Sequence, residues 1–323
     1  DAGSLLSAPD VLADNVTLSQ RGRFSKRTLH DYEYNSNSTL GGTYSDAYAL
    51  IFRANQILFY VQNFEGESKN NIIAEGYTSE YGGSHAEVNA INSLKNKDLL
   101  SECSLYVTLE PCSHFGKTPP CSDLILKYKI PRVFIGIKDP NPKVSGKGIK
   151  KLKENGVHVE VEILAKECKN HHKIFLTNIT KKRPFITLKW AETADGYIAP
   201  KEKKNTKPVW ISNKYSQQLS HKLRSEFDCI LVGSKTIIDD DPSLNTRQWH
   251  GRSPKVVVLN RKNNLDKNLN VFKTGSEILI IDNKTISNNK NITKQICKFL
   301  KSNNISSIIV EGGAQTLKTF LKE

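Results

Sequence analysis

Residues 107–125 read VTLEPCSHFGKTPPCSDLI, in which Cys112 follows an apolar, strand-like run and Cys121 immediately precedes a helix-like run. Upstream, a helical pattern over residues 84–94 begins with His85 and Glu87. One imidazole and two thiolates can hold Zn²⁺ and leave a fourth position open for water, and a helix N-terminus favours the thiolate form of a cysteine. This arrangement predicts a zinc site made of His85, Cys112 and Cys121.

Glu87 could transfer protons at this site. Bound zinc lowers the pKa of a water molecule toward neutrality, and a carboxylate two residues from a zinc ligand can carry a proton from that water to a leaving amine. A His-x-Glu segment followed by Pro-Cys is the pattern of zinc nucleobase deaminases. The plainer alternatives are a surface histidine beside core cysteines, or a structural zinc ion held by four protein ligands.

Apolar runs on either side alternate between strand and helix periods, which indicates α/β layers. The first series has strands at 72–74, 105–109, 132–137 and 157–161, with helices at 84–94, 122–129, 148–155 and 166–178. Arg183-Pro184 looks like a linker between two domains. After it, the second series has strands at 185–191, 229–233, 255–259, 277–281 and 307–311, with helices at 214–225 and 293–302. We therefore expect domains over residues 71–182 and 183–323, preceded by an atypical, mainly helical segment over residues 1–70.

The charge of the chain changes sign near residue 70. Residues 1–70 carry six Lys and Arg against eight Asp and Glu, and the remaining residues carry 41 against 25. A basic balance can indicate nucleic acid, an acidic surface or phosphorylated substrates as partners. No basic stripe with interleaved aromatic residues is present, so a general Lys- and Asn-rich composition is the favoured explanation and we expect no nucleic acid partner. No apolar run is long enough to cross a bilayer, and six scattered cysteines are typical of a reducing cytoplasm.

The eight residues between Cys112 and Cys121 set this segment apart from common deaminases, which place two residues there. Together with Asp139-Pro-Asn-Pro142 and Val144-Ser-Gly-Lys-Gly148, it resembles the deaminase half of the bifunctional riboflavin-biosynthesis deaminase/reductases. The resemblance implies a cytidine-deaminase-like three-layer αβα domain. It also implies that His85, Cys112 and Cys121 bind zinc, that Glu87 is the catalytic proton shuttle, and that His114, Lys117, Asp139 and Asn141 bind the substrate.

The second domain lacks a Gly-x-Gly-x-x-Gly fingerprint, and its Glu311-Gly312-Gly313 segment alone predicts only a tight strand-to-helix turn. However, LKWAETADGYIA (188–199), HKLRSEFDCILVGSKTIIDDDPSLNTR (221–247) and IIVEGGAQTL (308–317) resemble the reductase half of the same family, in the same order. The resemblance implies a dihydrofolate-reductase-like α/β domain, with NADPH contacts from Trp210, Thr236, Asp240, Gly313 and Ala314. It implies substrate contacts from Arg224, Leu244, Arg247 and Glu311, and guanidinium groups suit a 5′-phosphate.

The first seventy residues depart from this family. Residues 46–63, DAYALIFRANQILFYVQN, have apolar residues at helical spacing and predict one buried helix. Residues 1–67 resemble a fragment of the SusD-like nutrient-binding outer-membrane lipoproteins, chiefly through Arg53-Ala-Asn-Gln-Ile-Leu58, and the alternative is a divergent helical extension of the enzyme. Because the family's first helix, first strand and Asn-Pro loop are not found here, we expect residues 1–67 and 71–323 not to share one core. We also expect a C-terminally incomplete reductase, because the chain ends at Glu323.

Together these features predict a cytoplasmic bifunctional enzyme with Zn²⁺ and NADPH as cofactors. It would hydrolyse the ring amine of 2,5-diamino-6-(5-phosphoribosylamino)pyrimidin-4-one and then reduce the ribosyl group to ribityl. Two alternatives stay open, namely a zinc deaminase of nucleobases or nucleosides, and a glycan-binding module in residues 1–70. We expect no membrane partner for residues 71–323, and assembly into a homo-oligomer is left open.

Overall fold

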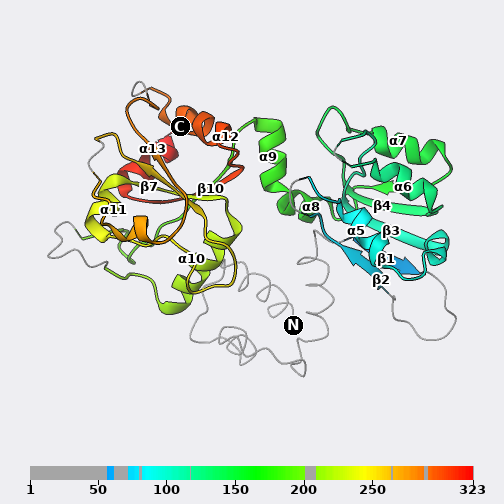
Figure 1. Cartoon of the computed structure of the whole chain (residues 1–323), viewed down its shortest axis with the longest axis horizontal. Helices are drawn as coiled ribbons and strands as arrows, with labels where there is room; N and C mark the ends of the chain where they lie inside the picture. The colour runs from blue at the N-terminus through cyan, green and yellow to red at the C-terminus, as the bar shows by residue number, and fades with distance from the viewer. Residues whose placement is uncertain are drawn as a thin grey trace. The chain divides into compact units, whose positions relative to one another are not determined.

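A computed structural model divides the chain into two compact units between His171 and His172 (Figure 1). It describes residues 57–61, 72–79, 82–116, 118–200, 209–262, 265–286 and 290–322. The resemblance of residues 1–67 to a lipoprotein fragment falls almost wholly outside these ranges. Within the described ranges, no helix is both long enough and apolar enough to cross a membrane.

The first unit is built on a sheet whose described strands have the order β2-β1-β3-β4-β5. The strands are β1 (Ile57–Val61), β2 (Ile72–Gly76), β3 (Cys103–Leu109), β4 (Arg132–Ile137) and β5 (His158–Val161). β1 is antiparallel to both of its neighbours, whereas β3, β4 and β5 run parallel to one another. Because the carboxyl ends of β3 and β4 meet at one edge of the sheet, the residues that follow these two strands lie close together.

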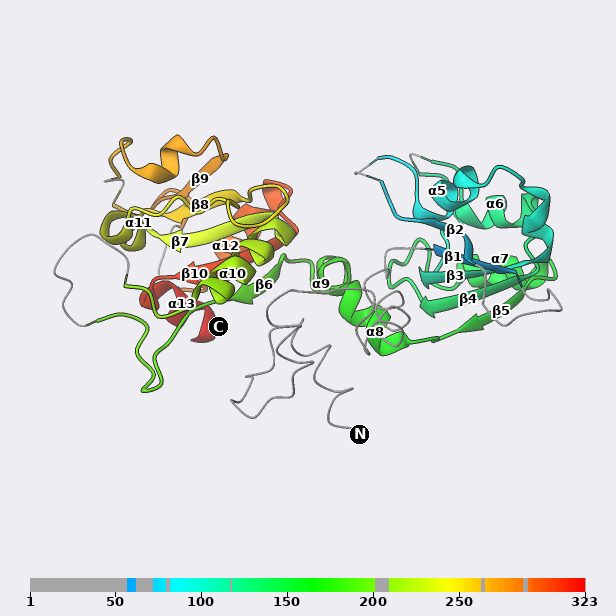
Figure 2. The same cartoon turned by 90° about the horizontal axis from the view of Figure 1, so that it is seen from below.

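Helices cover both faces of this sheet. They are α5 (Ala86–Ser93), α6 (Cys121–Lys127), α7 (Lys147–Glu154) and α8 (Ala165–His171), with a 3₁₀ turn at Asp98–Glu102. Val133 and Ile135 of β4 belong to a core cluster to which α5, α6 and α7 contribute Ala90, Ile125 and Leu152. Gly136 faces the other way, because side chains alternate along a strand, and a Cβ placed there would lie 2.3 Å from the Cys168 Sγ atom of α8. Figure 2 shows α5 and α6 on one side of the strands and α8 on the other, so the expected three-layer αβα domain is confirmed.

The expectation of a single helix over residues 46–63 is wrong at residues 57–61. This segment, ILFYV, forms β1 and pairs its backbone with β2 on one side and β3 on the other. Its residues are β-branched, aromatic or apolar, which suits a strand, and two partner strands satisfy the backbone groups along both edges. The expectation that this sheet lacks its first strand is therefore also wrong.

The second unit has a sheet whose described strands are all parallel, in the order β6-β10-β7-β8-β9. The strands are β6 (Phe185–Leu188), β7 (Cys229–Gly233), β8 (Lys255–Leu259), β9 (Ile278–Ile281) and β10 (Ser307–Gly312). The helices are α9 (Lys173–Lys181), α10 (Lys214–Glu226), α11 (Ser234–Asp240), α12 (Ile292–Ser302) and α13 (Ala314–Lys322), with a 3₁₀ turn at Asn270–Lys273. The single helix expected over residues 166–178 is instead α8 and α9, which are separated at His172.

Two apolar clusters sandwich the second sheet. Leu231 of β7 packs in a cluster with Ile296 of α12 and Leu317 of α13. The next residue, Ile230, faces the other way and packs in a cluster with Ile237 of α11. α11 was not expected from the sequence, and it begins at the residue that directly follows β7.

Gly76 allows α5 to approach the sheet closely. A Cβ at this position would lie 2.5 Å from the Ala86 carbonyl oxygen and 2.5 Å from the Ala90 backbone nitrogen. We expect Gly76→Ala to push α5 outward and to lower the free energy of unfolding by about 1–3 kcal/mol, the usual cost of overpacking. Denaturant unfolding measures this loss. Gly116→Ala is the matched control, because nothing lies within 4 Å of a Cβ there, and equal stability of the two variants would contradict the expectation.

Candidate active sites

Three potential zinc ligands converge at one end of the first sheet. His85 precedes α5, Cys121 is the first residue of α6, and Cys112 lies in the loop after β3. Their ligand atoms all lie within 4.8 Å of one another. His85 Nδ1 is 3.5 Å from Cys112 Sγ and 3.3 Å from Cys121 Sγ. One imidazole and two thiols fit zinc, and a three-residue ligand set leaves a position for water.

The two thiols of this cluster differ in acidity. Hydrogen bonds from the Cys121 thiol, from His85 and from the Cys121 backbone N–H, which is 3.2 Å away, outweigh burial and lower the pKa of Cys112 to about 4. The same Cys121–Cys112 hydrogen bond, together with burial and the nearby Glu87, raises the pKa of Cys121. Metal binding requires the thiolate form of both cysteines.

Glu87 lies in the first turn of α5 and is buried. Burial raises the pKa of its carboxyl group, and the charge of Cys112 raises this pKa further. The Cys121 side chain and the charge of His85 act partly against this rise, so the carboxyl group is a neighbour of both residues. The structure therefore brings together the four residues expected at the deaminase centre.

Asp139 and Asn141 follow β4, at the edge of the sheet where the loop carrying Cys112 begins. The Asp139 Oδ1 atom accepts a hydrogen bond from the Asn141 backbone N–H at 2.8 Å. Burial raises the pKa of Asp139, and the charges of Cys112 and His114 also act on it, so these groups are neighbours. Lys117, the remaining expected substrate contact, lies outside the described residues.

Glu110 was not expected as a functional residue, although it lies inside the stretch that defines the site. It is 4% exposed. Its Oε2 atom accepts from the backbone N–H groups of Asp139 at 3.2 Å and Gly146 at 2.9 Å. Its Oε1 atom accepts from those of Gly148 at 3.1 Å and Ile149 at 3.2 Å. Glu110 therefore joins the strand that leads to Cys112 to the loop of Asp139 and to the first turn of α7.

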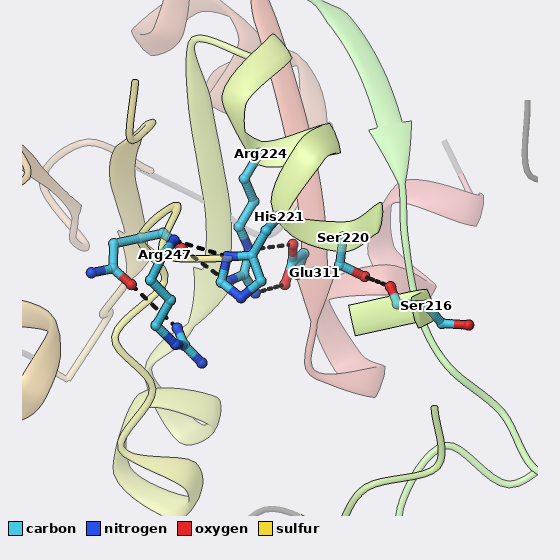
Figure 3. A network of polar contacts seen from close by, with 7 residues as sticks. Ser216, Ser220, His221, Arg224, Arg247 and Glu311 are labelled. Carbon is cyan, nitrogen blue, oxygen red and sulfur yellow. Dashed lines mark hydrogen bonds and ion pairs between the residues drawn. The ribbon is translucent and has the colours of Figure 1, made fainter. Parts of the chain in front are cut away.

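In the second unit, Arg224 of α10 and Glu311 of β10 form a bidentate ion pair (Figure 3). Arg224 Nε donates to Glu311 Oε1 at 2.9 Å and Nη2 donates to Oε2 at 2.6 Å. Burial opposes ionisation of Glu311, but the charge and hydrogen bonds of Arg224, with help from Lys189, hold its pKa below the ordinary value. Two residues assigned to the substrate thus form a rigid, charged pair.

Arg247 is linked to this pair through Asn245 and His221. Arg224 Nη1 donates to the Asn245 carbonyl oxygen at 3.3 Å, and Arg247 Nη1 donates to Asn245 Oδ1 at 3.2 Å. The backbone N–H of Arg247 donates to His221 Nδ1 at 3.2 Å. His221 and Asn245 were not expected; the spacing of His221, three residues before Arg224 on one helix face, is the signal that could have indicated it.

The remaining expected residues lie on several elements. Gly313 and Thr236 are close, since a Cβ on Gly313 would lie 3.0 Å from Thr236 Oγ1. Ala314 begins α13, and Asp240 ends α11. Leu244 is buried in the core cluster of this face. Trp210 is 61% exposed, and no described contact joins it to the others.

Both halves of the chain match known domain families. Residues 55–137 match the cytidine and deoxycytidylate deaminase zinc-binding region, and residues 184–323 match the RibD C-terminal domain. The first match begins just before β1, in agreement with the place of β1 in the sheet. Fold and site together define a zinc-type deaminase joined to a reductase domain.

Comparisons over most of the chain agree with these two domain matches. The chain is 37% identical to riboflavin biosynthesis protein RibD of Aquifex aeolicus, over 79% of this chain and 75% of that protein. It is 36% identical to the RibD protein of Bacillus amyloliquefaciens, over 79% and 72%. A crystal structure of a Thermotoga maritima diaminohydroxyphosphoribosylaminopyrimidine deaminase/5-amino-6-(5-phosphoribosylamino)uracil reductase superposes with a TM-score of 0.71 at 36% identity, covering 83% of this chain and 76% of that one. The chain belongs to the riboflavin biosynthesis protein RibD family.

The ligand set predicts one zinc ion per chain. We expect replacement of both Cys112 and Cys121 by Ser to abolish zinc binding, because hydroxyl groups are poor replacements for thiolates at such a site. Metal analysis of the purified protein measures the stoichiometry. Cys297→Ala, which removes a thiol from the second unit, should retain the metal. Full zinc content in the double variant would overturn the ligand assignment.

The four hydrogen bonds of Glu110 predict a large effect on stability. We expect Glu110→Ala to lower the free energy of unfolding of the first unit by at least about 3 kcal/mol, because each hydrogen bond to a charged group contributes roughly 1.5–3 kcal/mol. Glu110→Gln should lose less, since one acceptor oxygen remains. Thermal unfolding followed beside Glu167→Ala, a change at an exposed carboxylate on α8, measures the difference. An alanine variant as stable as this control would show that the network is dispensable.

Proposed function

We propose that this protein catalyses two consecutive steps of riboflavin biosynthesis. The first is hydrolytic deamination of 2,5-diamino-6-(5-phosphoribosylamino)pyrimidin-4-one, and the second is NADPH-dependent reduction of the ribosyl group to a ribityl chain. The observation that carries the proposal is the cluster of His85, Cys112 and Cys121 with the buried Glu87 beside it. The reductase domain on the same chain supports the second step.

In the deaminase, His85, Cys112 and Cys121 would hold the zinc ion. When bound, zinc lowers the pKa of a water molecule and so provides a nucleophile at neutral pH. The Glu87 carboxylate would accept a proton from the attacking water and deliver it to the ring amine, which leaves as ammonia. Its electrostatic interactions with His85 and Cys112 support this role, because they indicate that the carboxyl group is a neighbour of the metal ligands.

Substrate recognition in the deaminase is assigned to His114, Lys117, Asp139 and Asn141. Asp139 and Asn141 lie at the carboxyl ends of parallel strands, where ligands of open α/β sheets commonly bind. The electrostatic effects of Cys112 and His114 on Asp139 support a common site for the pyrimidine and the metal. The polar groups of this loop suit the amino and carbonyl edges of the ring.

In the reductase, Arg224 and Arg247 would recognise the phosphorylated ribose, with Leu244 and Glu311 beside them. Guanidinium groups bind phosphate through two parallel hydrogen bonds, and the bond between Arg224 and Glu311 fixes the orientation of one of them. Trp210, Thr236, Asp240, Gly313 and Ala314 would contact NADPH, which supplies a hydride to the ribose C1′ atom when bound. The N-terminus of α13 is a suitable place for a cofactor phosphate.

We further propose that the enzyme acts in the cytoplasm on free phosphorylated pyrimidines, without nucleic acid or a membrane. All six cysteines are free thiols in the structure, and two of them, Cys112 and Cys121, are the proposed metal ligands. A reducing compartment maintains such thiols.

A single substitution tests the deaminase mechanism. Glu87→Gln should keep the zinc ion and lose ammonia release by roughly 10²–10⁴-fold, because an amide cannot shuttle protons. Ammonia release and zinc content are measured on the same preparation. Glu154→Gln, the same chemical change at an exposed carboxylate, is the control and should behave as wild type. Near-native deamination by Glu87→Gln would rule out its role.

A further inference from the structure

His221 is a buried polar side chain that the proposed mechanism does not use. It lies on α10, one turn before Arg224, and is 4% exposed. Its Nδ1 atom accepts the hydrogen bond from the Arg247 backbone N–H. In Figure 3 the ring lies between Arg247 and the pair of Arg224 and Glu311.

Only a neutral imidazole can accept this hydrogen bond, so the ring proton must be on Nε2. The charged groups that face the ring are Arg224 from α10 itself, Arg247 from the following loop and Glu311 from β10. Burial, followed by the charges of Arg224 and Arg247, lowers the pKa of His221 to about 4, against the opposing effects of the Asn245 backbone and then of Glu311. The acceptor is therefore present at neutral pH.

The hydrogen bond fixes a short segment of backbone. Arg224 holds the carbonyl oxygen of Asn245, and His221 holds the backbone N–H of Arg247. Asn245 Oδ1 in turn accepts from the Arg247 guanidinium group. Residues 245–247 are thus attached to one face of α10 at two points. The side chain of Arg247 is exposed beyond this attachment, where an anionic ligand can reach it.

We propose that His221 is a positioning residue that presents Arg247 to the phosphate of the reductase substrate. This inference rests on the proposed function, because it assumes that Arg247 binds the phosphorylated ribose. His221 acts through the Arg247 backbone and makes no contact with the substrate or with NADPH. A guanidinium group held in its binding position before the substrate arrives loses less freedom on binding, which strengthens binding.

Two variants separate this role from a general contribution to stability. His221→Leu removes the acceptor and keeps most of the side-chain volume. His221→Asn keeps an acceptor oxygen close to the position of Nδ1. We expect His221→Leu to raise the KM for 5-amino-6-(5-phosphoribosylamino)uracil about tenfold, at the lower end of the range for leaving an N–H group without its acceptor, because this N–H is part-buried. The KM for NADPH and kcat should stay within about twofold of wild type. His221→Asn should recover most of the loss.

Ser220→Ala is the matched control. Ser220 is the adjacent residue on α10, and its hydroxyl donates to the Ser216 carbonyl oxygen within the helix. This variant should leave both KM values unchanged. A rise in the two KM values together in His221→Leu, or no recovery in His221→Asn, would overturn the positioning role.

The same assay with a substrate lacking the 5′-phosphate separates the inference from the proposed function. If wild type binds both substrates equally, Arg247 is not a phosphate ligand and the proposed substrate assignment fails. If wild type discriminates between them and His221→Leu discriminates equally well, the inference about His221 fails while the proposed function stands. The expected result is that His221→Leu loses part of the preference for the phosphorylated substrate.

Discussion

The deaminase site depends on the acceptance of four backbone hydrogen bonds by one buried carboxylate. Glu110 lies two residues before Cys112, and its partners lie in the segment from Asp139 to Ile149. A buried carboxylate is costly unless its oxygens are hydrogen-bonded, so this group and the loop stabilise each other. Gly148 approaches so closely that a Cβ there would lie 2.1 Å from the Pro111 carbonyl oxygen. These contacts consequently fix the positions of Cys112, of the loop that contains Asp139 and of α7 relative to one another.

In the reductase half a buried carboxylate is stabilised by a charged side chain and not by backbone N–H groups. Glu311 is also a buried carboxylate, on β10, which lies between β6 and β7, but a guanidinium group neutralises it. Arg224 uses its third guanidinium nitrogen, Nη1, to hold the Asn245 carbonyl oxygen, so the ion pair also shapes the following loop. In both halves a buried acid therefore determines the path of a loop that carries residues proposed to bind substrate. The difference is that dipoles of the backbone hold Glu110, whereas a full charge holds Glu311.

Most elements and the metal cluster could be predicted because their signals are local. The apolar runs of β3, β4, β7 and β8 and the ligand spacing are visible in the sequence. β1 could not be predicted, because ILFYV lies within a helix-like apolar pattern and its strand partners are distant in the chain. The role of Glu110 requires four donors that only the pairing of β3 with β4 brings near. His221 likewise depends on Arg247, which lies 26 residues further along.

The place of β10 has a consequence for how the two halves are made. β10 is the last described strand, yet it lies between β6 and β7. As the chain leaves the ribosome from its N-terminus, every described strand of the first sheet is available once residue 161 has emerged. β6 cannot pair with its described neighbour, β10, until residues 307–312 have been synthesised. Strands without partners are prone to aggregate. During synthesis the deaminase sheet can therefore form first, whereas the reductase sheet is complete only when β10 has joined β6 to β7.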